Sequence, residues 1–324
     1  MNRARLALCV TKVCCPLPSK VLACHEMCAD NGGLVLAGGT GQALTTAFRP
    51  SQDLTYTPLS ATSDGGRIWS ALSPLDAPLA STPDSLAAQP DTGRLVALLT
   101  SGTAEQAAAA GATWTTLITA RALAATPAGR SCGLHAITAV AYTAAGAPLL
   151  AGTCSRLGTA GIFISTGGAW QAARPALTGA LARQPVTVLR LSNSGDQTAA
   201  LLAAGTGQHA TLVAAWSANG GTRWTLSPPL TTSGQAITAA SFGPSQTAAV
   251  ITAGGHGAML TDGRWQLLPA LPAGTMALVP AAGGTADALA VHRATLTIWQ
   301  LTSPSGSWTR AQAINVPIQY GSSG

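Results

Sequence analysis

Six of the eight tryptophans of this chain recur at a near-regular interval, and each of the six closes a short run of small turn residues. The interval is about 41 to 56 residues, and the six copies are Trp69, Trp114, Trp170, Trp224, Trp265 and Trp308. Repeats of about this length are typical of the four-stranded blades of a β-propeller. The spacing therefore predicts an all-β chain built from repeated blades.

Two of these tryptophans end a nearly complete turn motif. Thr62–Trp69 reads T-S-D-G-G-R-I-W, and Ser217–Trp224 reads S-A-N-G-G-T-R-W. Asp64 and Asn219 each offer a short acceptor that can bond backbone N–H groups two or three residues ahead. The paired glycines allow a positive φ without steric cost. We expect both motifs to close hairpin loops, with each tryptophan ring packed over its hairpin.

The shared pattern is Ser or Thr, any residue, Asp or Asn, any residue, Gly, two residues and Trp. It resembles the Asp-box, the bacterial-neuraminidase repeat of sialidase-like and photosystem II assembly factor-like β-propellers. The resemblance implies a structural role for these positions and names no ligand. The residues that carry it are Thr62, Asp64, Gly66, Trp69, Ser217, Asn219, Gly221 and Trp224.

Strand patterns between the tryptophans support the same architecture. Alternating or apolar runs bounded by turn residues predict strands at 135–142, 148–154, 161–165 and 169–173, at 186–191, 199–204, 211–217 and 223–227, and at 237–242, 248–253, 258–261 and 264–268. Several of them, such as 199–204, are small and apolar on both faces. This pattern fits strands that are buried between neighbouring blades.

We expect a propeller of six blades that is closed by its C-terminal strand. The first unit shows a second, third and fourth strand at 33–38, 54–61 and 67–72, but no first strand. The apolar run at 313–320 can supply that strand and leave no open sheet edge. The alternative is a ring of seven blades, whose last blade lies within residues 1–30 or beyond Gly324.

Residues 1–31 differ from the rest and are expected to form a leader or disordered segment before one propeller domain over 32–324. The short apolar run after the basic start is broken by Pro16 and Lys20 before it reaches the length of a signal core. Val21–Cys24 looks like a bacterial lipobox, which makes Cys24 a candidate lipid anchor. No later stretch predicts a transmembrane segment. We expect an exported monomer, extracellular or at the cell surface.

Charged residues are sparse, which argues against solvated helices. They make up 9% of the chain, well below the usual quarter. The formal net charge is +6, yet Lys12 and Lys20 are the only lysines and the later basic residues are isolated arginines. No basic run interleaves with aromatic residues, so nucleic-acid binding is not expected.

The seven cysteines divide between the N-terminal segment and the body of the chain. The five cysteines of the first 28 residues lack the paired spacing of a zinc site, so we expect no metal and no cofactor. Cys132 and Cys154 flank two neighbouring predicted strands. They come within disulfide range if the compartment is oxidising, and otherwise form two buried free thiols.

The resemblance to sialidases implies an enzyme as the alternative function. Their activity is attributed to three arginines that grip a carboxylate, a Tyr nucleophile paired with Glu, and an Asp acid/base. Here the only glutamates are Glu26 and Glu105, and no sequence feature pairs either with a tyrosine (Tyr56, Tyr142 or Tyr320). The nearest match to the Arg-Ile-Pro signature is Phe48–Arg49–Pro50, which lacks the Ile.

We therefore expect a non-catalytic propeller that acts as an exported protein- or glycan-binding or scaffold module, with no catalytic residues assigned. The alternative is a sialidase-like glycoside hydrolase acting on glycans. Long loops between strands would offer the binding surface, and the sequence suggests them at 73–90, 102–113 and 118–133.

Overall fold

The structure is a computed structural model that describes most of the chain after the first strands. It gives the backbone at 34–35, 43–46, 59–62 and 70–71, and residues 83–89, 92–108, 113–194, 197–206, 210–292 and 295–315. These residues belong to two compact units, one ending at Gly234 and the other beginning at Gln235. The expectation of a single domain over 32–324 stays a prediction.

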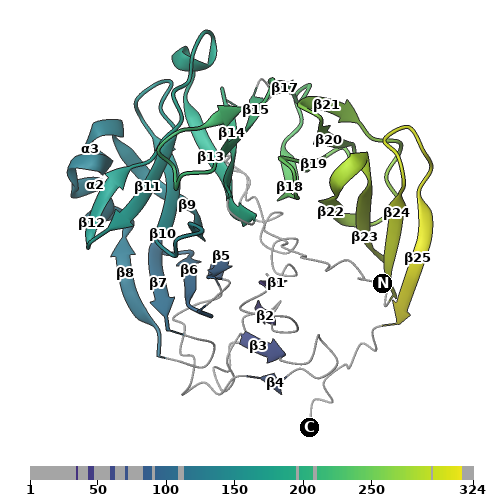
Figure 1. The fold of residues 1–324 in the computed structure, drawn as a ribbon, viewed down its shortest axis with the longest axis horizontal. Coiled ribbons are helices and arrows are strands. Elements are labelled where there is room, and N and C mark those ends of the chain that lie inside the picture. Colours follow the sequence, from purple (N-terminus) through teal and green to yellow (C-terminus); the bar gives the residue numbers. More distant parts are fainter. Residues whose placement is uncertain are drawn as a thin grey trace, which may run out of the picture. The chain divides into compact units, whose positions relative to one another are not determined.

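The first unit opens with two four-stranded antiparallel sheets, each joined in chain order (Figure 1). The first contains β1 (Leu34–Val35), β2 (Ala43–Thr46), β3 (Leu59–Thr62) and β4 (Ser70–Ala71). The second contains β5 (Pro83–Ala88), β6 (Leu95–Leu99), β7 (Thr103–Ala107) and β8 (Thr115–Thr119).

A third and a fourth group of strands in this unit join into one larger sheet. The third group is β9 (Leu134–Tyr142), β10 (Pro148–Cys154), β11 (Gly161–Thr166) and β12 (Ala169–Ala172). The fourth is β13 (Val186–Ser194), β14 (Gln197–Ala204), β15 (Thr211–Ser217), β16 (Thr225–Leu226) and β17 (Leu230–Thr231). A single register pair, Thr153 with Thr187, links β10 to β13.

The outer strand of the fourth group is interrupted. Both β16 and β17 pair with β15, at different places along it. Between them Ser227 donates its backbone N–H to the Ala214 oxygen at 2.8 Å, and its Oγ accepts from the Ala214 N–H at 3.0 Å. Pro228 and Pro229 follow, and because proline has no N–H the regular ladder stops there.

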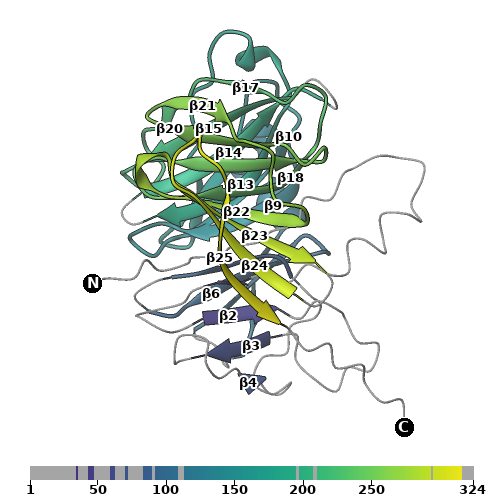
Figure 2. The ribbon, with the colours of Figure 1, turned by 90° about the vertical axis from the view of Figure 1, so that its right-hand side faces the viewer.

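The second unit consists of two further four-stranded sheets (Figure 2). One contains β18 (Ile237–Phe242), β19 (Ala248–Thr252), β20 (Gly257–Thr261) and β21 (Arg264–Leu267). The other contains β22 (Thr275–Pro280), the 3-10 turn η3 (Ala282–Gly284), β23 (Ala286–His292), β24 (Thr295–Leu301) and β25 (Thr309–Asn315).

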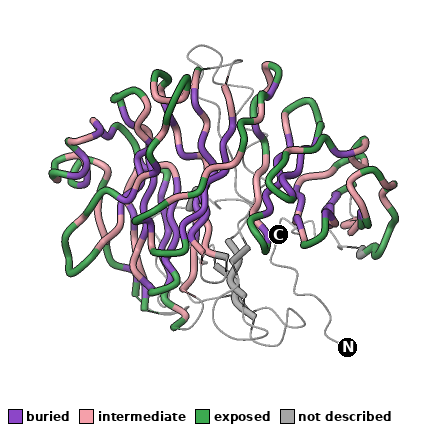
Figure 3. Tube along the Cα trace, turned by 45° about the horizontal axis from the view of Figure 1, so that its top comes forward, coloured by how far each residue is buried: buried purple, intermediate pink, exposed green. Residues whose placement is uncertain are grey.

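Across the described residues, consecutive antiparallel strands form six blade-like repeats, five of four strands and one of five because its outer strand is interrupted, and the predicted all-β propeller class is confirmed. The strands of the third, fourth and fifth groups begin and end within a few residues of their predicted bounds. The repeat length read from the tryptophans is thus the length of one group. Figure 3 shows buried residues concentrated along the strands and exposed residues in the connections.

The strand order of the first sheet differs from the prediction. The segment 33–38 holds the first strand, β1, and not the second, which is β2. Since the sheet has four strands of its own, it needs none from the C-terminus. Ala313–Asn315 pairs instead with β24, as the end of β25, and Val316–Tyr320 lies outside the described residues.

The three segments predicted as long loops all contain regular structure. Strand β5 lies within 73–90 and β7 within 102–113. The segment 118–133 contains two short helices, α2 (Ala120–Ala125) and α3 (Pro127–Cys132). Pro83 and Asp84 disfavour a strand locally, but pairing with β6 overrides that preference.

The core of the first unit is made of small and branched apolar residues, as the patterns predicted. In β14, five consecutive residues from Thr198 to Leu202 are buried. One cluster joins β9 to β15 through residues such as Leu149, Ile162, Val188 and Leu202. Alanine-rich strands leave little side-chain volume, which lets neighbouring sheets approach closely.

Candidate functional site

The turn from Ser217 to Trp224 is closed by a set of short hydrogen bonds. The buried Ser217 Oγ accepts from the Gly221 N–H at 2.8 Å and donates to Asn219 Oδ1 at 2.9 Å. Asn219 Oδ1 also accepts from the Arg223 N–H at 2.8 Å, four residues ahead. Gly220 and Gly221 have φ values of 65° and 92°, which other residues adopt only with strain. These bonds hold the turn of the β15–β16 hairpin in one conformation.

Trp224 connects this turn to the preceding group of strands. Its Nε1 donates to the oxygen of Ala173 at 3.1 Å and to that of Gly221 at 3.0 Å. Ala173 directly follows β12. A similar bond occurs in the second unit, where Trp308 Nε1 donates to the Pro269 oxygen at 3.5 Å, just beyond β21. The indole of each turn therefore attaches one sheet to the outer end of the sheet before it.

The first copy of the turn cannot be compared in the same way. Thr62 ends β3, and the side chain of Thr62 and the residues Asp64, Gly66 and Trp69 lie outside the described residues. The structural role of the first copy stays a prediction.

Tyr142 is placed where it cannot serve as an accessible nucleophile. It ends β9, is 1% exposed, and its hydroxyl has no hydrogen-bond partner among the described residues. Burial raises the pKa of Tyr142, while the charge of Arg94 lowers it. Glu105 lies on β7 in another sheet, and partial burial raises its pKa. Glu26, Tyr56, Tyr320 and Phe48–Pro50 lie outside the described residues.

We expect Tyr142→Phe to stabilise the protein by about 1 kcal/mol at neutral pH, because it removes a buried hydroxyl without a partner and keeps the ring. The raised pKa means that above the ordinary value of 10.0 the unfolded chain loses its proton first. Wild-type stability should then fall with rising pH, and the advantage of the variant should grow. Urea unfolding at pH 7 and above about pH 10 measures both effects. A destabilised variant at pH 7 would mean that the hydroxyl is hydrogen-bonded.

The two helices before β9 form a compact insertion. Thr119 caps α2 by accepting from the Ala122 N–H at 3.1 Å, and Thr126 caps α3 by accepting from the Gly129 N–H at 3.0 Å. Pro127 stands at the start of α3, where its missing N–H costs nothing, and Gly133 ends the helix in the left-handed region. Leu123 is the apolar residue that α2 buries.

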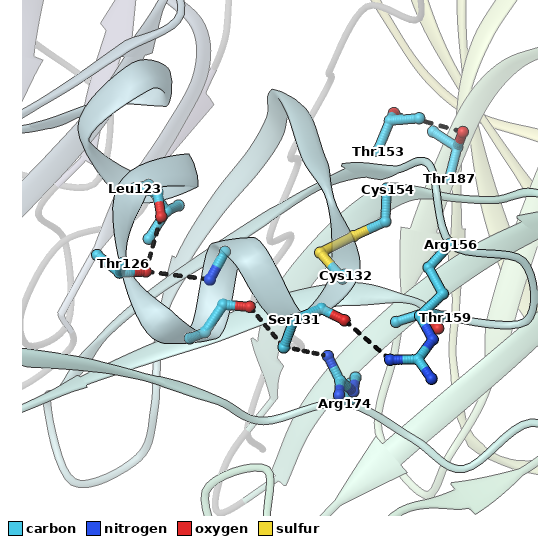
Figure 4. Close-up of a disulfide and its surroundings, with 12 residues drawn as sticks. Leu123, Thr126, Ser131, Cys132, Thr153, Cys154, Arg156, Thr159, Arg174 and Thr187 are labelled. Atoms are coloured by element: carbon cyan, nitrogen blue, oxygen red, sulfur yellow. Dashed lines mark hydrogen bonds between the residues drawn. A yellow bond between two sulfur atoms is a disulfide. The ribbon is translucent and has the colours of Figure 1, made fainter.

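A disulfide between Cys132 and Cys154 fastens the insertion to the sheet (Figure 4). It joins the last residue of α3 to the last residue of β10, and both cysteines are buried. Two backbone bonds run beside it, from the Ser155 N–H to the Gly133 oxygen at 2.9 Å and from the Arg156 N–H to the Cys132 oxygen at 3.0 Å. The end of α3 is therefore held against the β10–β11 loop.

Two arginines from different loops meet at Ser131 of α3 (Figure 4). Arg156 Nη1 donates to the Ser131 backbone oxygen at 3.3 Å, and Arg174 Nη1 donates to Ser131 Oγ at 3.0 Å. Ser131 Oγ in turn donates to the Ala128 oxygen at 2.7 Å. Each guanidinium carries five N–H donors, so most of them remain available to a ligand. Neither guanidinium bonds a carboxylate among the described residues.

The sequence carries a signal for this site in the distribution of its charges. Residues 106–195 contain no Asp or Glu and six arginines, which are Arg121, Arg130, Arg156, Arg174, Arg183 and Arg190. The other eleven basic residues equal the eleven acidic residues in number, so this stretch accounts for the whole net charge of +6. Counting charges over the full chain hides the asymmetry.

The residues Arg130, Arg156, Leu157, Arg174 and Arg183 define what we call the arginine surface. Arg130 of α3 donates to the Ala125 oxygen. Arg183 ends the 3-10 turn η1 (Leu181–Arg183). The next residue, Gln184, accepts a hydrogen bond from the Gly158 N–H through its backbone oxygen at 2.7 Å. Leu157 is 55% exposed between these segments. The surface combines guanidinium groups whose recorded bonds are to neutral oxygens with an apolar side chain, which suits carboxylate-bearing ligands.

Neither a metal-binding group nor a membrane-spanning helix is found among the described residues. They contain no group of three His, Cys, Asp or Glu side chains placed to hold a metal ion. None of the helices described is long and apolar enough to span a membrane.

Comparison with known proteins gives structural likeness only. No protein family and no curated protein matches the sequence. YCF48 bound to a D1 peptide matches with a TM-score of 0.52 and 14% identity over 86% of this chain and 80% of that one. A Lactobacillus plantarum protein matches with a TM-score of 0.54 and 12% identity over 88% and 84%. A six-bladed, fucose-recognising Aleuria aurantia lectin reaches 0.47 and 13% identity over 90% and 98%. These identities show the fold alone.

Proposed function

We propose that this chain is a non-catalytic, exported binding module that takes up an acidic segment of a partner protein at the arginine surface. The observation that carries the proposal is the concentration of the net charge in an acid-free stretch, two of whose six arginines, Arg156 and Arg174, converge on Ser131. Uncompensated guanidinium groups bind carboxylates through paired hydrogen bonds. The exposed Leu157 adds an apolar contact beside them.

Two further observations support the proposal. The propeller-like YCF48 has been solved with a D1 peptide bound, so a related architecture accepts a peptide. A buried disulfide fits an oxidising compartment, which agrees with export, and a lipid anchor at Cys24 is part of the same proposal. The Ser217–Trp224 turn belongs to the framework because its polar groups are satisfied within the protein.

The test is binding of a fluorescent peptide of glutamate and leucine residues, with a glutamine-for-glutamate peptide as the ligand control. We expect Arg156→Gln and Arg174→Gln each to weaken binding about fivefold to tenfold, or roughly 1 to 1.4 kcal/mol. Binding should also weaken with salt. The exposed Arg264 on β21 provides the matched control, and Arg264→Gln should leave the affinity unchanged.

Three results would contradict the proposal. An equal loss with Arg264→Gln would mean that the peptide senses only total charge. Binding of a sulfated oligosaccharide without binding of the peptide would show that the ligand is a glycan. Turnover of a fluorogenic sialoside would show that the protein is an enzyme.

A further inference from the structure

The disulfide lies between the two segments that form the centre of the arginine surface. Cys132 directly follows Ser131, and Cys154 precedes Arg156 by two residues. The disulfide therefore holds Ser131 close to Arg156, one of the two arginines that bond it. Arg174 reaches Ser131 from the other side, from the segment that follows β12.

Apart from the disulfide, the insertion is held by a few buried side chains that join the neighbouring core cluster and by hydrogen bonds. Helices α2 and α3 have six residues each, and helices of this length are not stable by themselves in water. Their buried residues are Leu123, Ala128, Gly129 and Cys132, which is a small apolar contribution. The capping bonds lie within the insertion itself. It is attached to the rest of the unit by the two backbone bonds to the 155–156 segment, by a bond from the Ala120 N–H to the Gly102 oxygen at 3.0 Å, and by the bonds of Arg156 and Arg174 to Ser131. The disulfide closes a long loop and restricts the open state.

Resting on the proposed function, we infer that the arginine surface is complete only while Cys132 and Cys154 are oxidised. When the disulfide is reduced, α3 separates from the sheet, Ser131 moves away, and Arg156 and Arg174 lose their common acceptor. A chain in a reducing compartment is then unable to hold an acidic partner. Binding competence is acquired after export, when the disulfide forms.

The reduction requires a dithiol reductant. One thiolate of the reductant attacks a cysteine sulfur, the sulfur–sulfur bond breaks, and the other cysteine leaves as a thiolate. The second thiolate of the reductant then resolves the mixed disulfide. Two electrons and two protons pass to Cys132 and Cys154, and the reductant becomes a disulfide. Because both cysteines are buried, the insertion must open locally before the first attack.

The experiment compares the full chain, oxidised and reduced with dithiothreitol, by two readouts. The first is the rate of trypsin cleavage at Arg121 and Arg130, followed by mass spectrometry, which reports the order of the insertion. We expect reduction to raise this rate about tenfold or more, since the cross-link suppresses local opening. The second is affinity for the glutamate–leucine peptide, which we expect to fall about fivefold or more on reduction.

A Cys132→Ser/Cys154→Ser variant controls for the five N-terminal cysteines. It should behave like the reduced protein, and dithiothreitol should change it no further. Equal cleavage in the oxidised and reduced proteins would overturn the inference, as would faster cleavage with unchanged peptide affinity. If the oxidised protein does not bind the peptide at all, the proposed function fails, while the cleavage rates still decide whether the disulfide controls the insertion.

Discussion

Trp224→Ala is expected to lower the free energy of unfolding by about 3 kcal/mol, the lower end of the range for a large aromatic side chain, because the ring is partly buried. The ring packs against the cluster that joins β9 to β15. Its Nε1 also bonds the Ala173 and Gly221 oxygens. The substitution therefore leaves a cavity and removes the bond that attaches the β15–β16 turn to the end of β12.

Trp224→Phe separates the two contributions. It keeps most of the ring and removes the N–H, so we expect a cost nearer 1 kcal/mol from the lost hydrogen bond, with some loss of packing. Urea unfolding of both variants, followed by far-UV circular dichroism, measures the difference. If the two variants lose the same free energy of unfolding, the hydrogen bond and not the packing accounts for the loss. A loss below about 1 kcal/mol for Trp224→Ala would show that the indole does not attach the turn to the end of β12.

Gly221→Ala is expected to destabilise the protein by about 2–5 kcal/mol. The left-handed backbone at this position costs about 1–2 kcal/mol for a residue with a Cβ, and overpacking adds about 1–3 kcal/mol. The added methyl group would lie 2.8 Å from the Ala173 Cβ. It would push the turn away from the end of β12, where the Trp224 bond is made.

The neighbouring glycine is a matched control for the steric part. Gly220 has a φ of 65°, but a Cβ there would meet only Thr143 Cγ2, at 4.0 Å. Gly220→Ala should therefore cost only the backbone strain, about 1–2 kcal/mol. Thermal and urea unfolding of the pair give the comparison. Equal losses at the two positions would mean that the contact with Ala173 is not tight.

The strands from 134 to 268 were predictable because their sequence pattern and their environment agree. The runs at 148–154 and 199–204 are apolar, bounded by turn residues, and buried on both faces. The first sheet was harder to assign because β1 and β4 have two residues each, too few for a periodic pattern. The prediction of 33–38 as the second strand is consequently wrong, because this segment holds the first, whereas the predicted third and fourth strands overlap β3 and β4.

The helical insertion was missed although its end signals are present in the sequence. Thr126 followed by Pro127 starts a helix, and Gly133 ends one. An alanine-rich segment of this length has no clear apolar stripe, so its pattern does not predict a helix. The convergence of Arg156 and Arg174 on Ser131 could not be predicted, because it depends on the registers that bring the ends of β10 and β12 together.

The interrupted outer strand of the fourth group limits how two copies of the protein can associate. A continuous outer strand is a template on which another chain can add a strand, and this is a common route to aggregation. Here Ser227 takes up the polar groups of Ala214, and Pro228 and Pro229 supply no N–H donors. The interruption makes sheet extension at this edge unfavourable and so works against this route to aggregation.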